Sequence, residues 1–236
     1  MPFEIQIAVA KTHKYASRDS GDTVELVERP AGGLSVVLVD GQGSGQAAKT
    51  LSLLVSAKAV ALLKDGARDG TVARAVHDYL HTFRHGRVSA TLEILSVDLI
   101  SKTVVSTRNS ETPLLLGREG EYELLRSSSG PIGIRRHTRP AVDQFDAVEG
   151  LQVAIFSDGV IQAGERYRRQ LDLLAFARAC LGPGLTAQAL ADALLAEALA
   201  RDANRPDDDM TVVALALRPR TEHPQVRRLV VELPLP

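Results

Sequence analysis

The sequence is poor in the residues that build stacking or disulfide-bonded surfaces. Its 236 residues include no Trp and one Cys, and only 4% are aromatic. A single Cys excludes a disulfide within the chain and is typical of a protein from a reducing compartment. Cys180 lies in an apolar, helix-like context with no His nearby in the sequence. We therefore expect it to be a buried small side chain rather than a nucleophile.

The chain also lacks an excess of basic charge. It has 28 Lys and Arg residues against 29 Asp and Glu residues, for a formal net charge of -1, and both signs are spread along its length. A protein that binds nucleic acid usually carries a basic stripe with interleaved aromatic residues, and an anionic membrane surface likewise attracts basic clusters. The composition therefore argues against nucleic acid and membrane as partners.

No targeting or membrane-spanning segment is evident in the sequence. The N-terminus has no basic start followed by an apolar run, and no uninterrupted apolar stretch is long enough to cross a bilayer. With 44% hydrophobic and 24% charged residues, the composition is that of an ordinary globular protein. We expect a cytoplasmic protein, and the sequence leaves its oligomeric state open.

Apolar periodicity predicts strands in runs and helices in pairs. The continuous run Leu34 to Val39 indicates a strand buried on both faces. The expected strands cover residues 3–10, 22–27, 34–39, 90–100, 103–107, 114–116, 122–125, 151–156 and 211–217. The expected helices run from a Gly-rich turn at 40–45 to Lys64, and over 71–83, 165–180 and 186–203.

This order favours the α+β class over an alternating βαβ sheet. Two mainly antiparallel sheets flanked by helix pairs, a four-layer αββα sandwich, would bury the apolar faces of all these elements. We expect residues 1–217 to form this domain. Residues 218–236 form a Pro-flanked tail that carries one more strand-like run, Arg228 to Leu233.

The most informative feature is the position of the aspartates. Asp40 and Asp158 each close a buried strand and precede a glycine, Asp22 opens a strand, and residues 207–209 are three aspartates that lead into the last strand. Carboxylates at the ends of buried strands are costly unless positive charge compensates them, and no basic residue stands beside these in the sequence. Clusters with only oxygen donors suit hard cations such as Mg²⁺ or Mn²⁺. A glycine after each aspartate would allow a sharp turn and a close approach of its carbonyl to an ion.

Each aspartate also has an ordinary structural explanation. Asp-Gly is a favoured turn pair, so Asp40 and Asp158 fit turns or helix caps equally well. Residues 207–209 fit a solvated loop. The four acidic sites together favour a metal centre, provided that the fold brings them to one edge of the core.

Seven short motifs extend this pattern over nearly the whole chain, from about Gly21 to Leu217. They are S-G-D-T at 20–23, V-D-G-Q-G-S-G at 39–45, S-A-T-L at 89–92, N-S-E-T-P at 109–113, G-P-I-G-I at 130–134, F-S-D-G-V at 156–160 and D-D-M-T-V-V at 208–213. In this order and spacing, the sequence resembles the PPM-type (type 2C) protein phosphatases, in particular the bacterial branch of the sporulation stage II E phosphatase.

The resemblance implies a serine/threonine phosphatase with an αββα sandwich and two divalent cations, Mn²⁺ or Mg²⁺. Carried over by motif, Asp40 and Asp158 are the catalytic residues, and both bind metal. The other implied metal ligands are Asp22, the carbonyl of Gly41, Asp208 and, where many relatives have Asn, Asp209. Asp40 would bridge both ions, and Asp22 would act partly through water.

The resemblance also has consequences for the reaction and its substrate. A cation pair lowers the pKa of a water that attacks the phosphorus. The substrate implied is a phosphorylated protein, in particular an anti-anti-sigma factor of the STAS type. The residues after Asp40 read Gln42-Gly43-Ser44, so the His general acid of relatives of the eukaryotic enzymes is not expected there.

Other readings stay open at this point. A pseudophosphatase would keep the fold as a binding module without catalysis. Residues 43–50 nearly match the phosphate-binding loop G-x-x-x-x-G-K-[ST], with Ala48 in place of a glycine, and also match a permissive dinucleotide fingerprint. His77, His81 and His85 recur every four residues, a spacing that can hold zinc, although a solvated or partner-facing stripe explains them better.

Overall fold

The computed structural model describes residues 3–15, 17, 19–127, 129–220 and 228–232. Ten strands are assigned among these residues: β1 Phe3–Thr12, β2 Thr23–Glu28, β3 Leu34–Gly41, β4 Ala90–Asp98, β5 Thr103–Asn109, β6 Leu114–Arg118, β7 Glu121–Leu125, β8 Ala141–Asp146, β9 Gln152–Phe156 and β10 Met210–Pro219. The helices are α1 Gly45–Lys64, α2 Asp69–Arg84, α3 Asp158–Ile161, α4 Leu173–Cys180 and α5 Ala187–Arg201, with a 3-10 turn, η1, at Glu165–Tyr167.

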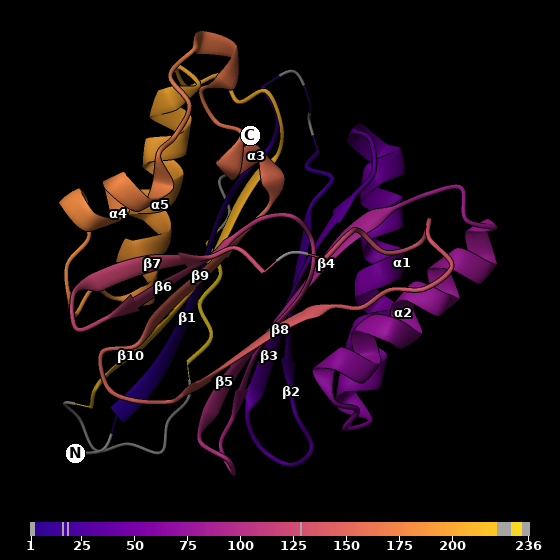
Figure 1. The fold of residues 1–236 in the computed structure, drawn as a ribbon, viewed down its shortest axis with the longest axis horizontal. Coiled ribbons are helices and arrows are strands. Elements are labelled where there is room, and N and C mark those ends of the chain that lie inside the picture. Colours follow the sequence, from indigo (N-terminus) through magenta and orange to yellow (C-terminus); the bar gives the residue numbers. More distant parts are fainter. Residues whose placement is uncertain (1–2, 16, 18, 128, 221–227, 233–236) are drawn as a thin grey trace.

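The strands form two five-stranded antiparallel sheets stacked face to face. One sheet has the order β1-β10-β9-β6-β7 and the other β2-β3-β4-β5-β8. Helices α1 and α2 cover the outer face of the second sheet, while α4 and α5 cover the first, which gives four layers (Figure 1). The predicted α+β sandwich is therefore confirmed.

The core divides into three layers of apolar side chains. Along β3, Val36 and Leu38 pack between the two sheets, and Val37 and Val39 pack under α1 and α2. All four are at most 1% exposed, which confirms the prediction of a strand buried on both faces. The alternation follows from the two-residue period of side chains along a strand.

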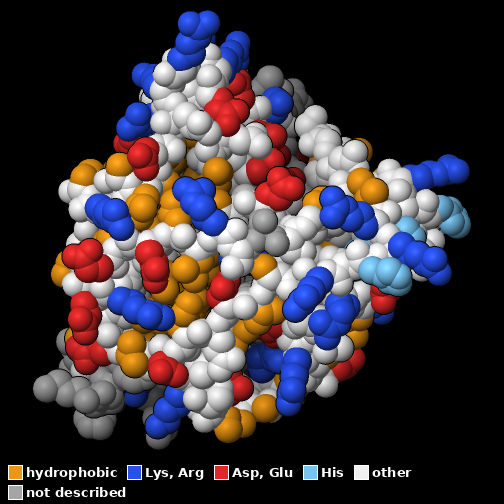
Figure 2. Space-filling view, viewed as in Figure 1, with side chains coloured by type: hydrophobic (Ala, Val, Ile, Leu, Met, Phe, Trp, Pro, Cys, Tyr) orange, Lys and Arg blue, Asp and Glu red, His pale blue; other side chains and the backbone are white. Residues whose placement is uncertain are grey.

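Helix α1 lies over β2 and β3 with Leu51, Val55, Ala59 and Leu63 buried against them. Among the described residues it is the one helix whose length and composition alone would suffice to cross a membrane, and 39% of its most apolar window is buried. The polar surface of the molecule has charges of both signs interspersed, as Figure 2 shows for one face.

The topology excludes the nucleotide-binding readings of residues 43–50. Both require β3 and the next strand to be parallel around one helix. Here two helices follow β3, and β4 pairs antiparallel to it, with Val37 opposite Ile94. The P-loop and dinucleotide alternatives are therefore wrong.

The structure corrects three local predictions. The helix expected over 165–180 is interrupted, because Arg168 adopts a left-handed conformation (φ 55°) and α4 begins only after Asp172, whose carboxylate accepts the Ala175 N–H at 3.0 Å. Cys180 ends α4 and is exposed rather than buried. Residues 228–232 lie outside any assigned strand; Leu233, at the end of that expected run, is outside the described residues.

The His stripe on α2 is neither a solvated surface nor a zinc site. His77 is 1% exposed, and burial lowers its pKa. Its Nδ1 accepts the Gly133 N–H at 3.3 Å, and the Nδ1 of His81 lies 3.0 Å from the Gly133 carbonyl oxygen. The two rings stack, and only His85 is fully exposed. The stripe thus fastens α2 to the loop between β7 and β8.

A buried charged cluster spans β4 and β5. Glu93 and Arg108 stand opposite each other in the sheet and are 1% and 0% exposed. Glu93 Oε1 accepts hydrogen bonds from the hydroxyls of Ser110 (2.7 Å) and Thr112 (2.5 Å). Arg108 donates to the carbonyl of Thr112 at 2.9 Å and to the carboxylate of Asp143 at 2.7 Å. The cluster holds the N-S-E-T-P segment against the sheet.

Candidate metal centre

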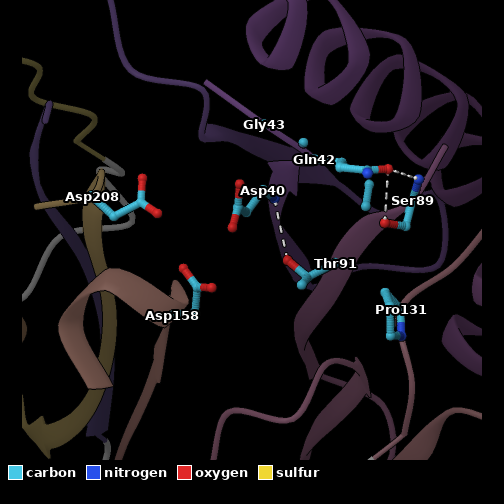
Figure 3. A pocket seen from close by; sticks show the side chains of 10 residues that line it. Asp40, Gln42, Gly43, Ser89, Thr91, Pro131, Asp158 and Asp208 are labelled. Atoms are coloured by element: carbon cyan, nitrogen blue, oxygen red, sulfur yellow. Dashed lines mark hydrogen bonds between the residues drawn. The ribbon is translucent and has the colours of Figure 1, made fainter. Parts of the chain in front are cut away.

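A pocket of about 210 Å³ opens where the two sheets end side by side. Carboxylates of Asp40, Asp158 and Asp208 point into it from different elements (Figure 3). Asp40 comes from the end of β3, whereas Asp158 begins α3 after β9 and Asp208 precedes β10. The remaining lining residues are Gly41, Gln42, Gly43, Ser89, Ala90, Thr91 and Pro131.

Asp40 stands at the centre of the acidic group. Its backbone N–H donates to the Thr91 hydroxyl at 3.3 Å, which fixes the end of β3 against β4. Burial, followed by the negative charges of Asp22, Asp158, Asp208 and Asp209, raises the pKa of its carboxyl to about 8. A carboxylate in such surroundings is ionised only at a cost that a cation would offset.

Asp158 and Asp208 face Asp40 from the other sheet. Burial, followed by the charge of Asp208, raises the pKa of Asp158. The Oδ1 of Asp208 accepts the N–H of Asp209 at 2.9 Å, so the loop before β10 orients this carboxylate itself. Both carboxylates line the same pocket, so both are accessible to a ligand bound there.

Asp22 is fully buried beside β10, at 0% exposure. Its Oδ2 accepts the Thr211 hydroxyl at 2.6 Å, while its Oδ1 is buried with no hydrogen-bond partner among the described residues. Burial raises the pKa of this carboxyl to about 6, against the opposing effects of the Thr211 and Ser157 hydroxyls. A buried carboxylate oxygen without a hydrogen-bond partner is energetically costly, and a bound cation or water would offset that cost.

Two lysines that the sequence did not assign to this site lie behind Asp22. Lys11 and Lys49 each donate from Nζ to its backbone carbonyl, at 2.7 Å in both cases. Burial, followed by the charge of Lys49, lowers the pKa of Lys11. They hold the start of β2 against β1 and α1 rather than pairing with the carboxylates. Lys49 is the lysine of the P-loop-like stretch at 43–50, and no sequence motif marks Lys11.

Asp209 is oriented differently from its neighbour. Its Oδ1 accepts the Lys14 N–H at 2.8 Å, and its Oδ2 accepts the Gly21 N–H at 2.6 Å. Both oxygens are thus engaged with the backbone of the β1–β2 connection. Asp209 therefore fastens the segment that leads to Asp22, although it contributes to the negative potential of the pocket.

The glycines of the two Asp-Gly pairs are required for close packing rather than for a turn. A Cβ on Gly41 would lie 2.3 Å from the carbonyl oxygen of Ala48 in α1, and a Cβ on Gly159 would lie 2.3 Å from that of Asp209. Neither glycine has a positive φ. The expected sharp turn is therefore wrong, and the glycines instead let α1 and the β10 loop approach the aspartates.

The wall opposite Asp158 and Asp208 is neutral. Gln42 Oε1 accepts the Ser89 N–H at 2.9 Å and its hydroxyl at 3.2 Å, which joins the Asp-Gly loop to the start of β4 (Figure 3). Pro131 borders the pocket because the segment after β7 bridges to β4, with Ile132 N–H donating to the Ala90 carbonyl at 2.9 Å. The S-A-T-L and G-P-I-G-I motifs therefore converge on the same pocket as the aspartates.

The donors in this pocket fit a hard divalent cation. They are the carboxylate oxygens of Asp40, Asp158 and Asp208, and no thiol or imidazole lines the cavity. The orphaned oxygen of Asp22 is buried and is not part of this lining. As the side chains stand, no three His, Cys, Asp or Glu residues of the described chain are grouped closely enough to enclose an ion. The carboxylates face one another across the pocket instead.

Comparison with known proteins agrees with this architecture. Residues 30–218 match the family model of stage II sporulation protein E (SpoIIE). The stage II sporulation protein E of Priestia megaterium is 24% identical over 227 residues, which are 93% of this chain and 37% of that protein. The chain therefore spans little more than a third of the length of this relative.

Solved structures show the same fold. The PP2C phosphatase domain of SpoIIE from Bacillus subtilis, with a fragment of its regulatory domain, aligns with a TM-score of 0.81 at 22% identity, over 93% of this chain and 65% of that one. RsbX in complex with magnesium gives 0.68 at 15% identity, over 90% and 95% of the two chains. The RsbU and RsbW domains of Rv1364c from Mycobacterium tuberculosis give 0.69 at 19%, over 92% and 61%. The chain belongs to the SpoIIE family, whose phosphatase domain is of the PP2C type.

Proposed function

We propose that this protein is a metal-dependent phosphatase that hydrolyses phosphoserine or phosphothreonine in a protein substrate. The observation that carries the proposal is that the carboxylates of Asp40, Asp158 and Asp208 converge on one pocket. Burial and four surrounding aspartates also raise the pKa of the Asp40 carboxyl to about 8. Such a group of carboxylates is costly to assemble for structure alone. It suits a site that holds cations, and the magnesium complex of the related RsbX supports the same chemistry.

In this proposal the carboxylates share two Mg²⁺ or Mn²⁺ ions. Asp40 would contribute to holding both ions, Asp158 and Asp208 would hold one, and Asp22 and the Gly41 carbonyl would serve the other. Asp209 keeps the position of Asp22 through its two backbone hydrogen bonds. When bound, the ions supply an activated water and neutralise charge on the phosphoryl oxygens.

The neutral wall of the pocket orients the phosphate. The Thr91 hydroxyl accepts the Asp40 N–H, so its proton remains free to donate to a phosphoryl oxygen. Ser89 is held beside it by Gln42. No His is among the residues that line the pocket, so no imidazole is in place there to protonate the leaving serine or threonine oxygen.

The substrate we propose is a phosphorylated regulator of the anti-anti-sigma, STAS type, in the cytoplasm. The support comes from relatives, because RsbU and RsbW domains occur together in the Mycobacterium tuberculosis protein and a further structural neighbour belongs to the bacterial stressosome. A phosphatase in such a circuit reverses the action of a serine kinase.

Hydrolysis of p-nitrophenyl phosphate tests the reaction directly. We expect turnover with saturating Mn²⁺ or Mg²⁺, no turnover with a chelator, and full recovery when the metal is restored. A phosphoserine peptide should be hydrolysed under the same conditions. Metal binding measured by calorimetry without any turnover would identify the chain as a pseudophosphatase and overturn the proposal.

The Gly159→Ala substitution tests the approach of α3 to the β10 loop. The new methyl group would meet the Asp209 carbonyl oxygen at 2.3 Å, so α3 and the loop must separate. We expect a loss of about 1–3 kcal/mol in stability and a fall of about a hundredfold in kcat/KM, since the spacing of Asp158 and Asp208 changes. Gly182→Ala is the matched control, because a methyl group there meets nothing within 4 Å. Equal activity of the two variants would contradict the assigned geometry.

A further inference from the structure

Four exposed arginines lie on the two segments that supply part of the neutral wall of the metal pocket. They come from the end of α2 and the connection to β4, and from the segment between β7 and β8. We call them the basic rim: Arg84, Arg87, Arg135 and Arg136. None of them forms an ion pair with a carboxylate in the part of the chain that the structure describes. Their positive charge is therefore available to a ligand.

The two segments that carry the basic rim are joined into one surface. The N–H of Ala90 donates to the Ile132 carbonyl at 3.2 Å, and the reverse bond is 2.9 Å long. A Cβ on Gly133 would lie 2.5 Å from the Val88 carbonyl oxygen, and one on Gly86 would lie 3.4 Å from that of Ile134. The two segments are therefore in close backbone contact, and they cannot separate without breaking these two hydrogen bonds.

The segments that carry the rim also line the proposed phosphate site. Ser89, Ala90 and Pro131 line the pocket, and each is within a few residues of a rim arginine. The guanidinium of Arg135 folds back over Gly130, since a Cβ there would lie 3.7 Å from its Cζ. Its charge thus stands next to Pro131, at the edge of the cavity.

Charges of both signs are interspersed over much of the face shown in Figure 2, but its side over α2 is mainly basic. Figure 2 shows Arg, Lys and His side chains gathered on the right of the molecule, over α2 and the segment that leads into β8. Acidic side chains occupy the adjoining upper centre of the same face. The formal net charge of the chain is -1, so this surface is a local feature and not a consequence of a basic protein.

We propose that the basic rim binds acidic side chains on either side of the phosphoserine in the substrate protein. The inference rests on the proposed function, because the phosphate must occupy the pocket for its flanking residues to reach the rim. Unpaired arginines are donors that match carboxylates in planar pairs. Complementary charge of this kind sets the choice of partner and the rate of association. The rim would thus select a phosphoprotein with an acidic segment.

Two phosphoserine peptides of equal length test the selection. One carries aspartates on both sides of the phosphoserine, and the other carries asparagines there. At an ionic strength of about 0.1 M we expect the wild type to hydrolyse the acidic peptide with a kcat/KM about tenfold higher. In a variant with R84Q, R87Q, R135Q and R136Q, the ratio of the two values should fall to near one. It should also fall in the wild type at about 1 M salt, where exposed charges are screened.

The matched control is R68Q together with R74Q. These arginines are also exposed, but they lie at the start of α2 and in its first half, roughly 24 Å and 15 Å along the helix from Arg84. The control should keep the wild-type ratio, and thermal unfolding checks that the rim variant is folded. Equal kcat/KM values for both peptides in the wild type would contradict the proposed role of the basic rim. The same fall of the kcat/KM ratio in the control variant would also contradict it.

The outcomes separate this inference from the proposed function. Turnover of p-nitrophenyl phosphate with no preference between the peptides contradicts the rim alone. Absence of all turnover contradicts the phosphatase, and binding of the fluorescently labelled acidic peptide, measured by anisotropy, then still reports on the rim. Displacement of that peptide by a single-stranded oligonucleotide at equal or lower concentration would show a general polyanion surface and would overturn selection of an acidic phosphoprotein.

Discussion

The Asp40→Asn variant is expected to lose metal-dependent hydrolysis by about a thousandfold or more. Asparagine keeps the size of the side chain but removes the charge that faces Asp22, Asp158 and Asp208. Without that charge, two cations cannot both be neutralised at the centre of the pocket. Turnover of p-nitrophenyl phosphate over a range of Mn²⁺ concentrations measures the loss.

Stability distinguishes this effect from unfolding. In the presence of a chelator at neutral pH, we expect Asp40→Asn to unfold at a higher temperature than the wild type. Folding of the metal-free wild type must protonate this carboxyl, whose pKa is about 8, or hold its charge against its neighbours, and asparagine carries neither cost. Asp207→Asn is the matched control, since this exposed aspartate pairs only with Arg166 at the surface, at 2.7 Å. The control should keep full activity. A fully active Asp40→Asn enzyme would remove the basis of the metal centre.

The layered fold was predictable because most of its elements are bounded by strong local signals. The run from Leu34 to Val39 gave β3 within two residues, and the apolar pattern of α1 gave its end at Lys64. Two elements were not predicted. β8, Ala141–Asp146, is an edge strand with only Phe145 buried, so its alternation is weak. α3 is four residues long, and its start at Asp158 resembles a turn.

The sequence predicted that the aspartates form one acidic site, but not which of them line the pocket and which bind the backbone. Strand ends and Asp-Gly pairs pointed to Asp40 and Asp158, and these do share a pocket with Asp208. Sequence could not separate Asp208 from Asp209, because the difference lies in which way each carboxylate turns. The sequence also could not reveal that Lys11 and Lys49 both donate to the backbone carbonyl of Asp22, because they lie 11 and 27 residues from it along the chain.

The basic rim could not be predicted from the sequence either, because its residues come together only in the fold. Its arginines are ordinary surface residues in the sequence, in two segments about 50 positions apart along the chain. Only the bridge between Ala90 and Ile132 brings them together beside the pocket. Likewise, the spacing of His77 and His81 suggested a metal or a solvated face, whereas the partner of both is the backbone of Gly133.

The buried cluster of Glu93 and Arg108 carries the second large expected effect. Arg108→Met should destabilise the protein by about 3 kcal/mol, because it leaves the carboxylates of Asp143 and Glu93 without their cation in the interior. Chemical denaturation measures this change. Arg118→Met is the matched control, since Arg118 is exposed and its guanidinium lies 5.4 Å from the centre of the Phe145 ring. Its loss should cost less than about 1 kcal/mol.

Glu93 supplies a pH dependence that tests the same cluster. Burial raises its pKa to about 7, against the opposing effects of Ser110, Thr112 and Arg108. The folded state therefore binds the proton more tightly than the unfolded state. The stability that this contributes is complete below the ordinary carboxyl value of 4.5 and is lost as the pH rises through about 7. Glu93→Gln should remove most of this decline, which amounts to at most about 3 kcal/mol.

Arg108→Met should move the decline to higher pH, because Glu93 then loses the cation that favours its ionised form. Denaturation midpoints measured from pH 4 to pH 9 in the wild type and both variants report the shift. The two substitutions should also be coupled: Glu93→Gln recovers part of the stability lost in Arg108→Met, since a neutral amide needs no cation. Strictly additive effects would mean that the two side chains do not act as one cluster, and that Arg108 is held by Asp143 and Thr112 alone.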